Sequence, residues 1–227
     1  MQGTENNTPQ GASVDHKRII TISRQFACRG TAVAKRLSEL LGMQMYSDWI
    51  AEETASRLNI PLEIVNQQEE TARVGLSMES LVSKAIPLFG KTTDAQDKIF
   101  QTQQEIIREL ADEGNCILVG RCSEFVLDDD DEVMCVHLYA TYGDRLAHCM
   151  DDLGMEEHAA RQLILKMDEI REAYCMEYTG YHLGEIPYTD VMMDVGFLGV
   201  QGTAQALAGI ADAWFSRQHR GIVSRRR

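Results

Sequence analysis

The sequence predicts an α/β protein whose parallel sheet carries helices on both faces. Short apolar runs without polar alternation, typical of strands buried on both faces, recur along the chain. Segments with apolar residues at helical spacing separate these runs, and this alternation indicates right-handed βαβ units. With 227 residues, of which 44% are hydrophobic and 25% charged, the chain has the length and composition of one globular domain.

The first half of the chain predicts two strands and several helices. The run Ile19–Ile22 is β-branched throughout, so we predict a buried strand at 18–23, and a shorter strand follows at 43–46. The predicted helices, each with apolar residues at helical spacing, span 32–41 (ended by Gly42), 49–58 and 94–113 (ended by Gly114), with one or two more expected within 60–92.

The second half predicts three more strands, at 116–119, 133–139 and 191–195. Helices are predicted at 143–152, 155–178 and 200–215. Ligands of such sheets bind at the carboxyl ends of the strands. The residues expected together at that edge are Ser23-Arg24, Gly120-Arg121 and Ala140-Thr141.

The first strand runs through a short turn directly into a helix. A strand, turn and helix in this order direct backbone N–H groups and a positive dipole end at one point, which suits a phosphate. The Walker signature G-x-x-x-x-G-K-[ST] is absent. Aligned with it, the chain has Arg24 and Arg29 at the glycines, Gly30 at the lysine and Thr31 at the hydroxyl. We therefore predict a P-loop NTPase-like sheet with altered phosphate chemistry.

The chain is expected to hold one main domain with two polar ends. Residues 1–15 lack periodicity and aromatic residues, which predicts a disordered arm, and residues 220–227 form a basic tail expected to be solvated. Residues 16–219 make the predicted α/β domain, with a helical insert at 60–92 and further helices within 143–180.

The net charge and the cysteine pattern limit the partners, the location and the kinds of site that we expect for this protein. A formal net charge of −13 argues against a nucleic-acid partner, which would need a basic face. No opening signal peptide and no apolar run of membrane-spanning length is present in the sequence, so we expect no membrane and a cytoplasmic location. The six cysteines lack paired zinc-site spacing and are expected to be free thiols, and the sequence leaves monomer and homodimer open.

The order of the motifs resembles the cytidylate kinase-like family of P-loop nucleoside monophosphate kinases. The resemblance covers nearly all of 18–215 and is carried by Thr21–Phe26, Ala32–Leu37, Val119–Cys122 and Asp168–Arg171. It implies phosphoryl transfer from ATP, with Mg²⁺, to a nucleoside monophosphate, and CMP is the acceptor it suggests. On this resemblance, residues 16–219 form a P-loop kinase-like domain, in which the insert at 60–92 would close on the acceptor and 143–180 would form lid-like helices.

The resemblance also implies roles for individual residues. Arg121 would hold the acceptor monophosphate, Asp168 would contact the acceptor base or sugar, and Arg171 would contact the transferring phosphate. Arg24 or Arg29 would replace the missing lysine, although an arginine offers phosphate a fork rather than a point charge. The nucleotide-binding set is Ser23, Gln25, Arg29, Gly30, Thr31, Arg145 and Arg161, and Thr31 is also the magnesium candidate.

Simpler roles stay open for several of these residues. Arg121 could pair with an acid such as Glu124, and Asp168 could pair with Arg171 on the same helix face. Thr31 could cap its helix instead of binding magnesium. Cys28, near a helix N-terminus, could have a lowered thiol pKa or be an unreactive small side chain.

The turn departs from the pattern of the family. Similar members commonly carry Gly-Ser-Gly-Gly where this chain has Ala27-Cys28-Arg29-Gly30. A phosphate nest needs close backbone approach and positive φ, which glycine adopts most readily. A catalytically weak or inactive nucleotide-binding protein is therefore the alternative function, and a partner-binding module without nucleotide is a third.

Overall fold

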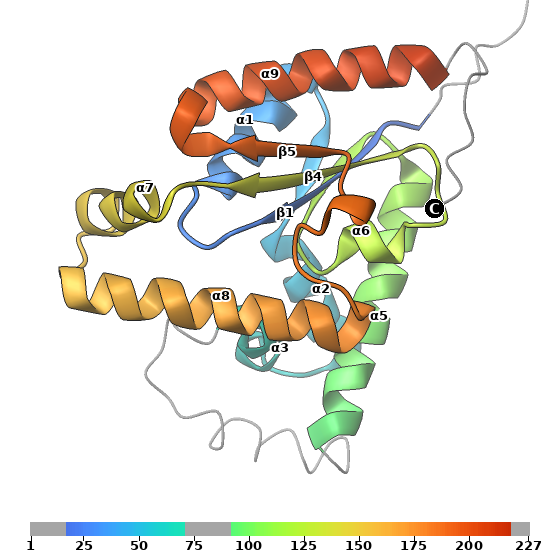
Figure 1. The fold of residues 1–227 in the computed structure, drawn as a ribbon. Helices are drawn as coiled ribbons and strands as arrows, with labels where there is room; N and C mark the ends of the chain where they lie inside the picture. Colours follow the sequence, from blue (N-terminus) through green and yellow to red (C-terminus); the bar gives the residue numbers. More distant parts are fainter. Residues whose placement is uncertain (1–16, 71–91, 219–227) are drawn as a thin grey trace, which may run out of the picture.

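The computed structural model describes residues 17–70 and 92–218, which form a parallel sheet of five strands with helices on both faces (Figure 1). The strand order is β2-β3-β1-β4-β5, and every pair is parallel. The strands are β1 (Ile19–Arg24), β2 (Gln44–Tyr46), β3 (Cys116–Val119), β4 (Val133–Tyr139) and β5 (Val191–Asp194). The predicted fold class is confirmed, and β1 lies at the centre between β3 and β4.

Helices connect the strands and cover the sheet. They are α1 (Gly30–Leu41), α2 (Asp48–Leu58), α3 (Leu62–Glu70), α5 (Thr92–Glu113), α6 (Ser123–Val126), α7 (Tyr142–Ala147), α8 (Glu157–Thr179) and α9 (Val195–Gln218). A π-helical segment, His148–Asp152, follows α7, and a short 3₁₀ turn, Ile186–Tyr188, precedes β5.

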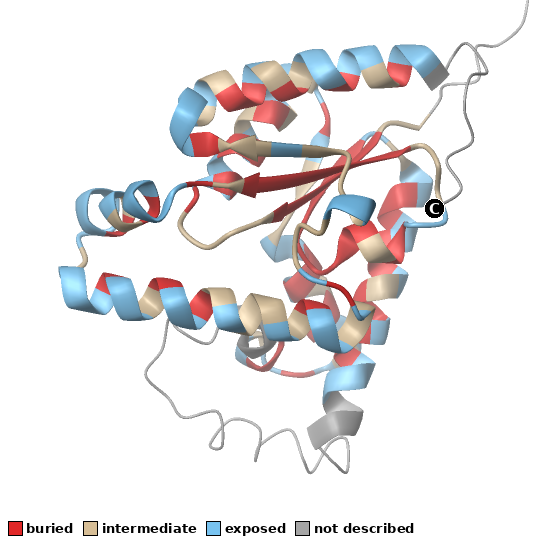
Figure 2. Cartoon of the chain, viewed as in Figure 1, coloured by how far each residue is buried: buried red, intermediate tan, exposed pale blue. Residues whose placement is uncertain are grey.

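Two apolar clusters hold the layers together, one on each face of the sheet. On one face α1 and α9 pack on strands β1, β3 and β4, through residues such as Leu37 and Leu207. On the other face Ile50 of α2 and Ile106 of α5 pack against the sheet. Figure 2 shows the result, because the central strands are buried almost throughout while the outer helices bury one side only.

Several predicted boundaries moved for identifiable reasons. Helix α8 begins at Glu157 because the carboxylate of Glu156 accepts hydrogen bonds from the backbone N–H groups of His158 and Ala159. The last helical element begins at Val195 and is divided by a kink at Gly199, whose φ is 66°, so the helix predicted from residue 200 begins directly after this kink. The helix predicted at 143–152 is α7 continued by the π-helical segment.

Some predictions fall outside the described residues. These are the arm at 1–15, the basic tail at 220–227 and, within the predicted insert, residues 71–91. Of that insert, α3 is described and packs near α8. Within the described residues, no helix combines the length and the apolar character needed to cross a membrane.

Candidate functional site

The loop between β1 and α1 is fastened to the end of β4. The backbone N–H of Gln25 donates to the carbonyl of Leu138 at 3.0 Å, and its side-chain oxygen accepts from the N–H of Ala140 at 3.3 Å. Ala27 and Arg29 have φ values of 59° and 61°, in the left-handed region that favours glycine. The loop thus keeps the backbone conformation typical of glycine at two positions, although these positions hold alanine and arginine.

Arg24 ends β1 and lies between two glycines. A Cβ atom on Gly30 would come within 2.9 Å of the Arg24 Cβ, and one on Gly120 would collide with the Arg24 guanidinium. The Nε atom of Arg24 is buried and has no hydrogen-bond partner among the described residues. A buried guanidinium N–H without a partner is costly, so this position suits an anionic ligand.

Two cavities open at the carboxyl edge of the sheet. The loop cavity is lined by residues 24–32, which run from the end of β1 into α1, and by His148, Asp152, Leu153 and Arg171. The turn cavity is lined by Ser23, Arg24, Gly120, Arg121, Cys122, Glu124, Arg171, Tyr174, Cys175 and Leu183. Arg24 and Arg171 line both cavities, and Arg121 joins them in the turn cavity. The structure therefore brings together the three arginines that the sequence analysis expected at one site.

Arg121 projects from a strained turn that follows β3. Gly120, Arg121 and Cys122 have successive φ values of 80°, 61° and 51°. Non-glycine residues in this region store of order 1–3 kcal/mol each, and such strain clusters at functional sites. The guanidinium is buried, with 6% of the residue exposed, in the wall of the turn cavity.

Asp168 and Arg171, on the same face of α8, are both connected to the loop between β1 and α1, Arg171 directly and Asp168 through Arg145. Arg171 donates from Nη1 to the carbonyl oxygen of Arg24 at 3.0 Å. Asp168 forms a two-pronged ion pair with Arg145 of α7, at 2.9 and 2.6 Å, and Arg145 also donates to the carbonyl of Phe26 at 3.1 Å. Asp168 and the buried Arg145 therefore hold the loop in place. This use of Arg145 was not anticipated.

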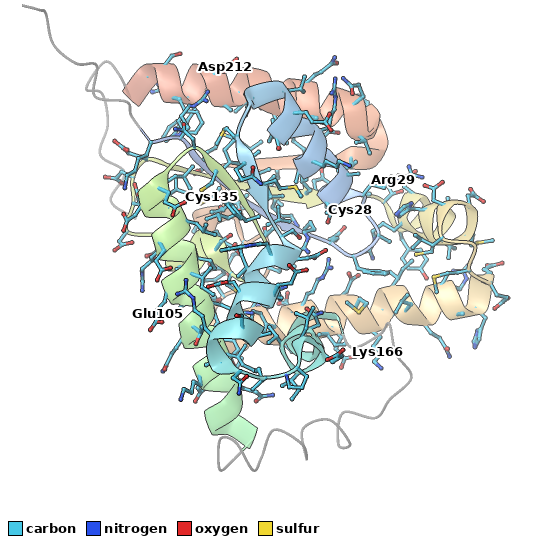
Figure 3. The ribbon with its side chains drawn as sticks, turned by 180° about the vertical axis from the view of Figure 1, so that it is seen from behind. Cys28, Arg29, Glu105, Cys135, Lys166 and Asp212 are labelled. Atoms are coloured by element: carbon cyan, nitrogen blue, oxygen red, sulfur yellow. The ribbon has the colours of Figure 1, made fainter. Side chains whose placement is uncertain are left out.

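Arg29 turns toward the π-helical segment instead of into the loop (Figure 3). Its Nε lies 3.0 Å from Asp152 Oδ2 and 3.1 Å from His148 Nδ1. His148 and Asp152 also contact each other at 2.7 Å. Hydrogen bonds from His148 and then Arg29 lower the pKa of the Asp152 carboxyl. Arg29, one of the two arginines expected to replace the missing lysine, is thus already paired with a carboxylate that lines the loop cavity.

Three other expectations have definite outcomes. Thr31 is the second residue of α1, whose N-cap is Arg29, so the capping interpretation is wrong, while Thr31 does line the loop cavity. Arg161 pairs with Glu157 at 2.6 Å and lies over the Tyr142 ring, outside both cavities. Burial raises the pKa of the Cys28 thiol, so the lowered pKa considered for it is wrong.

The site includes a histidine that the sequence analysis interpreted as a core or edge residue. Ser23 of β1 and His137 of β4 are register partners, and Ser23 Oγ lies 2.9 Å from His137 Nδ1. Burial lowers the pKa of His137 to about 4, so the ring is neutral near pH 7. His137 also lines an open cavity with Gln25, Asp168, Glu169, Glu172 and Leu183. Pairing the two predicted strands in register would have found this contact.

Three features together define a P-loop kinase fold: the order of the strands, the loop between β1 and α1, and the edge of the sheet that three arginines line. Comparison with solved structures agrees. An uncharacterized protein from Eubacterium ventriosum ATCC 27560 matches with a TM-score of 0.63 and 23% identity, over 87% of this chain and 99% of that one. Shikimate kinase from Bacteroides thetaiotaomicron matches with a TM-score of 0.50 and 9% identity, over 87% and 99%.

The chain belongs to the cytidylate kinase-like family, whose family model matches residues 19–196. None of the curated proteins matches the chain. The family and the fold are those of nucleotide-binding phosphotransferases.

Proposed function

We propose that this protein transfers a phosphoryl group from ATP to a nucleoside monophosphate, with CMP the first acceptor to test. One observation carries the proposal: Arg24 and Arg171 line both the loop cavity and the turn cavity, and Arg121 lines the turn cavity. Two cations between a donor-phosphate loop and a second cavity are what direct transfer between two phosphates requires.

Each residue then has a physical task. The loop cavity would take the triphosphate and the turn cavity the acceptor phosphate, bound by the guanidinium of Arg121. Arg24 and Arg171 would neutralise charge on the phosphoryl group during its transfer and would hold the donor and acceptor phosphates in line. Asp168 would act through Arg145 to hold the loop, and the exposed part of its carboxylate faces the cavity where base or sugar would lie.

Magnesium would bind with the donor phosphates. Within the described residues, no group of three or more His, Cys, Asp or Glu side chains is arranged to hold a metal ion. Mg²⁺ in kinases needs only one or two protein ligands beside phosphate oxygens and water. The Thr31 hydroxyl, exposed in the first turn of α1 and lining the loop cavity, fits that requirement. The ion would offset the negative charge of the donor phosphates.

A catalytically weak or inactive nucleotide-binding protein is the second candidate. The observation that favours it is at the loop, where Ala27 and Arg29 occupy left-handed positions and Arg29 is held by Asp152. Removing one preorganised donor from a transition-state site costs roughly 100- to 1000-fold in rate. A loop without the Walker lysine could therefore bind nucleotide with little turnover.

Calorimetric titration separates the two candidates. The protein is titrated with ATP–Mg²⁺ and, separately, with CMP, dCMP, UMP, AMP and GMP, and ADP release is followed for each binding pair. Binding with turnover supports the kinase and identifies its acceptor. Binding without turnover supports the second candidate, and the absence of any binding would contradict both.

Arg121→Gln tests the acceptor role directly. The variant should lose monophosphate binding while keeping ATP binding, because Arg121 lines the turn cavity but not the loop cavity. Arg36→Gln is the matched control, since Arg36 pairs with Glu39 and Gln201 on the surface of α1. Equal loss of ATP and monophosphate binding in Arg121→Gln would contradict the assignment.

A further inference from the structure

Two cysteines from distant parts of the chain meet in the turn cavity. Cys122 belongs to the strained turn after β3, and Cys175 lies near the C-terminal end of α8. Both line the cavity and pack in one cluster with Phe100 and Tyr181. Neither thiol has a role in the phosphoryl transfer proposed above.

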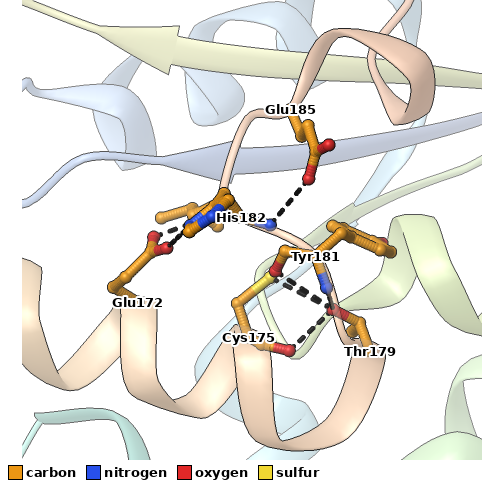
Figure 4. A network of polar contacts seen from close by, with 7 residues as sticks. Glu172, Cys175, Thr179, Tyr181, His182 and Glu185 are labelled. Atoms are coloured by element: carbon orange, nitrogen blue, oxygen red, sulfur yellow. Dashed lines mark hydrogen bonds and ion pairs between the residues drawn. The ribbon is translucent and has the colours of Figure 1, made fainter.

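The two thiols are in contact, and Cys175 is held in place. Its thiol makes a hydrogen bond with Cys122 and lies 3.5 Å from the hydroxyl of Thr179. Figure 4 shows how this comes about: Thr179 donates to the Cys175 carbonyl at 2.6 Å and accepts from the N–H of Tyr181 at 3.2 Å. These bonds fix the last turn of α8 and the residues after it, so Cys175 Sγ stays directed at its neighbours.

We propose that Cys122 and Cys175 form a dithiol modification site, which an oxidant of the hydroperoxide class converts to a disulfide across the turn cavity. The Cys175 thiolate would attack the peroxide, so that an S–O bond forms, the O–O bond breaks and water or an alcohol leaves. The Cys122 sulfur would then attack the sulfenic acid, forming the S–S bond and releasing water. Two thiols and one hydroperoxide thus give one disulfide, one water, and a second water or an alcohol.

The surroundings distinguish this pair from the other thiols. The hydrogen bond with Cys122 is the main cause of a lowered pKa at Cys175, in spite of burial. Burial instead raises the pKa of Cys28, of Cys149 and of Cys116, the last to about 12. A second hydrogen bond, with Thr179, also lowers the pKa of Cys175, while the charges of Glu124 and Glu172 raise it.

A disulfide here would alter the acceptor side of the site. It would tie the Gly120–Cys122 turn to α8 and fill space beside Arg121. We expect it to weaken binding of the acceptor phosphate, and this consequence rests on the proposed function. The formation of the disulfide does not, so the two can fail separately.

The experiment is a mass measurement on the full chain. Reduced protein is treated with hydrogen peroxide, remaining thiols are alkylated, and the product is digested with trypsin and chymotrypsin without reduction. Cleavage after Arg121 and Phe125 separates Cys122 from Cys116 and Cys135. We expect a peptide pair joined through Cys122 and Cys175, two hydrogens lighter than its parts, that disappears on reduction. Links through other cysteines, or sulfinic acid at Cys175 without a link, would overturn the proposal.

Two variants and one binding assay complete the test. Cys175→Ser should abolish the link, and Cys149→Ser, which removes a buried thiol from a separate cluster, should leave it unchanged. Should Cys175→Ser not fold, the link in the wild-type chain still decides the proposal. Titration of oxidised and re-reduced protein with the monophosphate then tests the consequence alone.

Discussion

Arg24 owes its position to two residues that have no side chain. Its aliphatic part passes over Gly30 and its guanidinium over Gly120, and a Cβ atom at either position would be too close. Only Gly120 adds a positive φ, of 80°. The two glycines leave the room in which the Arg24 side chain lies beside both cavities. A cation that is in place before the phosphate binds is preorganised for it, which is the condition for strong electrostatic stabilisation.

Gly120→Ala should therefore damage the site more than the fold. Positive φ alone costs an alanine about 1–2 kcal/mol of stability, and the clash should also displace the Arg24 guanidinium. We expect loss of both ATP and monophosphate binding in calorimetry, because Arg24 lines both cavities.

Gly42→Ala is the matched control for that substitution. Gly42 has a φ of 62° at the end of α1, and no atom lies within 4 Å of the position of an added Cβ. Its alanine variant should show a similar stability loss in chemical denaturation and unchanged nucleotide binding. If both variants bind nucleotide equally well, Gly120 does not serve to position Arg24.

At the scale of elements, the start of α1 and the π-helical segment after α7 are joined by one small polar cluster. Arg29 comes from the first, and His148 and Asp152 come from the second. The Asp152 carboxylate occupies the place on Arg29 that a donor phosphate would need. Because these groups are largely exposed, their attraction is screened and the competition should be modest.

Asp152→Asn should therefore tighten ATP binding by a factor of roughly two to five, the range of an exposed ion pair. The neutral amide releases Arg29 for phosphate while keeping the size of the side chain. Calorimetric titration with ATP–Mg²⁺ measures the change. Asp151→Asn removes the same charge one residue earlier, at an exposed carboxyl that lines neither cavity, and should have a smaller effect. Equal effects would mean that only net charge matters.

Elements with strong periodicity or strong stops could be predicted from the sequence. Strands 116–119 and 133–139 were predicted with the bounds that the structure gives, because apolar runs of that length fit a buried strand. α6 and the 3₁₀ turn were missed, since elements of four and three residues have too few positions to show a period. The helix predicted from residue 200 begins directly after the kink at Gly199, and the short helical stretch before that kink, from Val195, was missed.

The site could be predicted in part. Arg24 and Arg121 follow directly from strand ends, which a parallel sheet must bring to one edge. The partners of Arg145 and Arg29 could not be found this way, because those ion pairs join residues 23 and 123 positions apart through helix packing. Arg161 shows the opposite error: spacing along α8 pointed to the site, but Glu157, one turn earlier, holds the side chain.

For the whole molecule, a net charge of −13 and the proposed nucleotide site are compatible only if the positive charge is gathered locally. The carboxyl edge of the sheet does this, because Arg24, Arg121 and Arg171 share one cavity there. Carboxylates stand close by, since Asp168, Glu169 and Glu172 line the adjoining cavity with His137. Burial nevertheless lowers the pKa of His137, so its ring adds no positive charge near pH 7.

The stability of the whole fold should depend on His137 between pH 4 and 6.5. Its pKa falls from an ordinary 6.5 to about 4 in the folded protein, so the unfolded chain takes up the proton first as the pH drops. Stability contributed by neutral His137 is complete above pH 6.5 and lost progressively down to about pH 4. At most about 3 kcal/mol is at stake, from 1.36 kcal/mol per pKa unit.

His137→Asn isolates this contribution, because the amide can still contact Ser23 and does not titrate. Urea denaturation of both proteins across this range should show the wild type losing stability relative to the variant as the pH falls. His158→Asn, at an exposed histidine of α8, should follow the wild-type curve. A constant difference between wild type and His137→Asn would mean that His137 takes up its proton in the folded and unfolded chains alike. The contact between Ser23 of β1 and His137 of β4 would then not depend on a neutral ring.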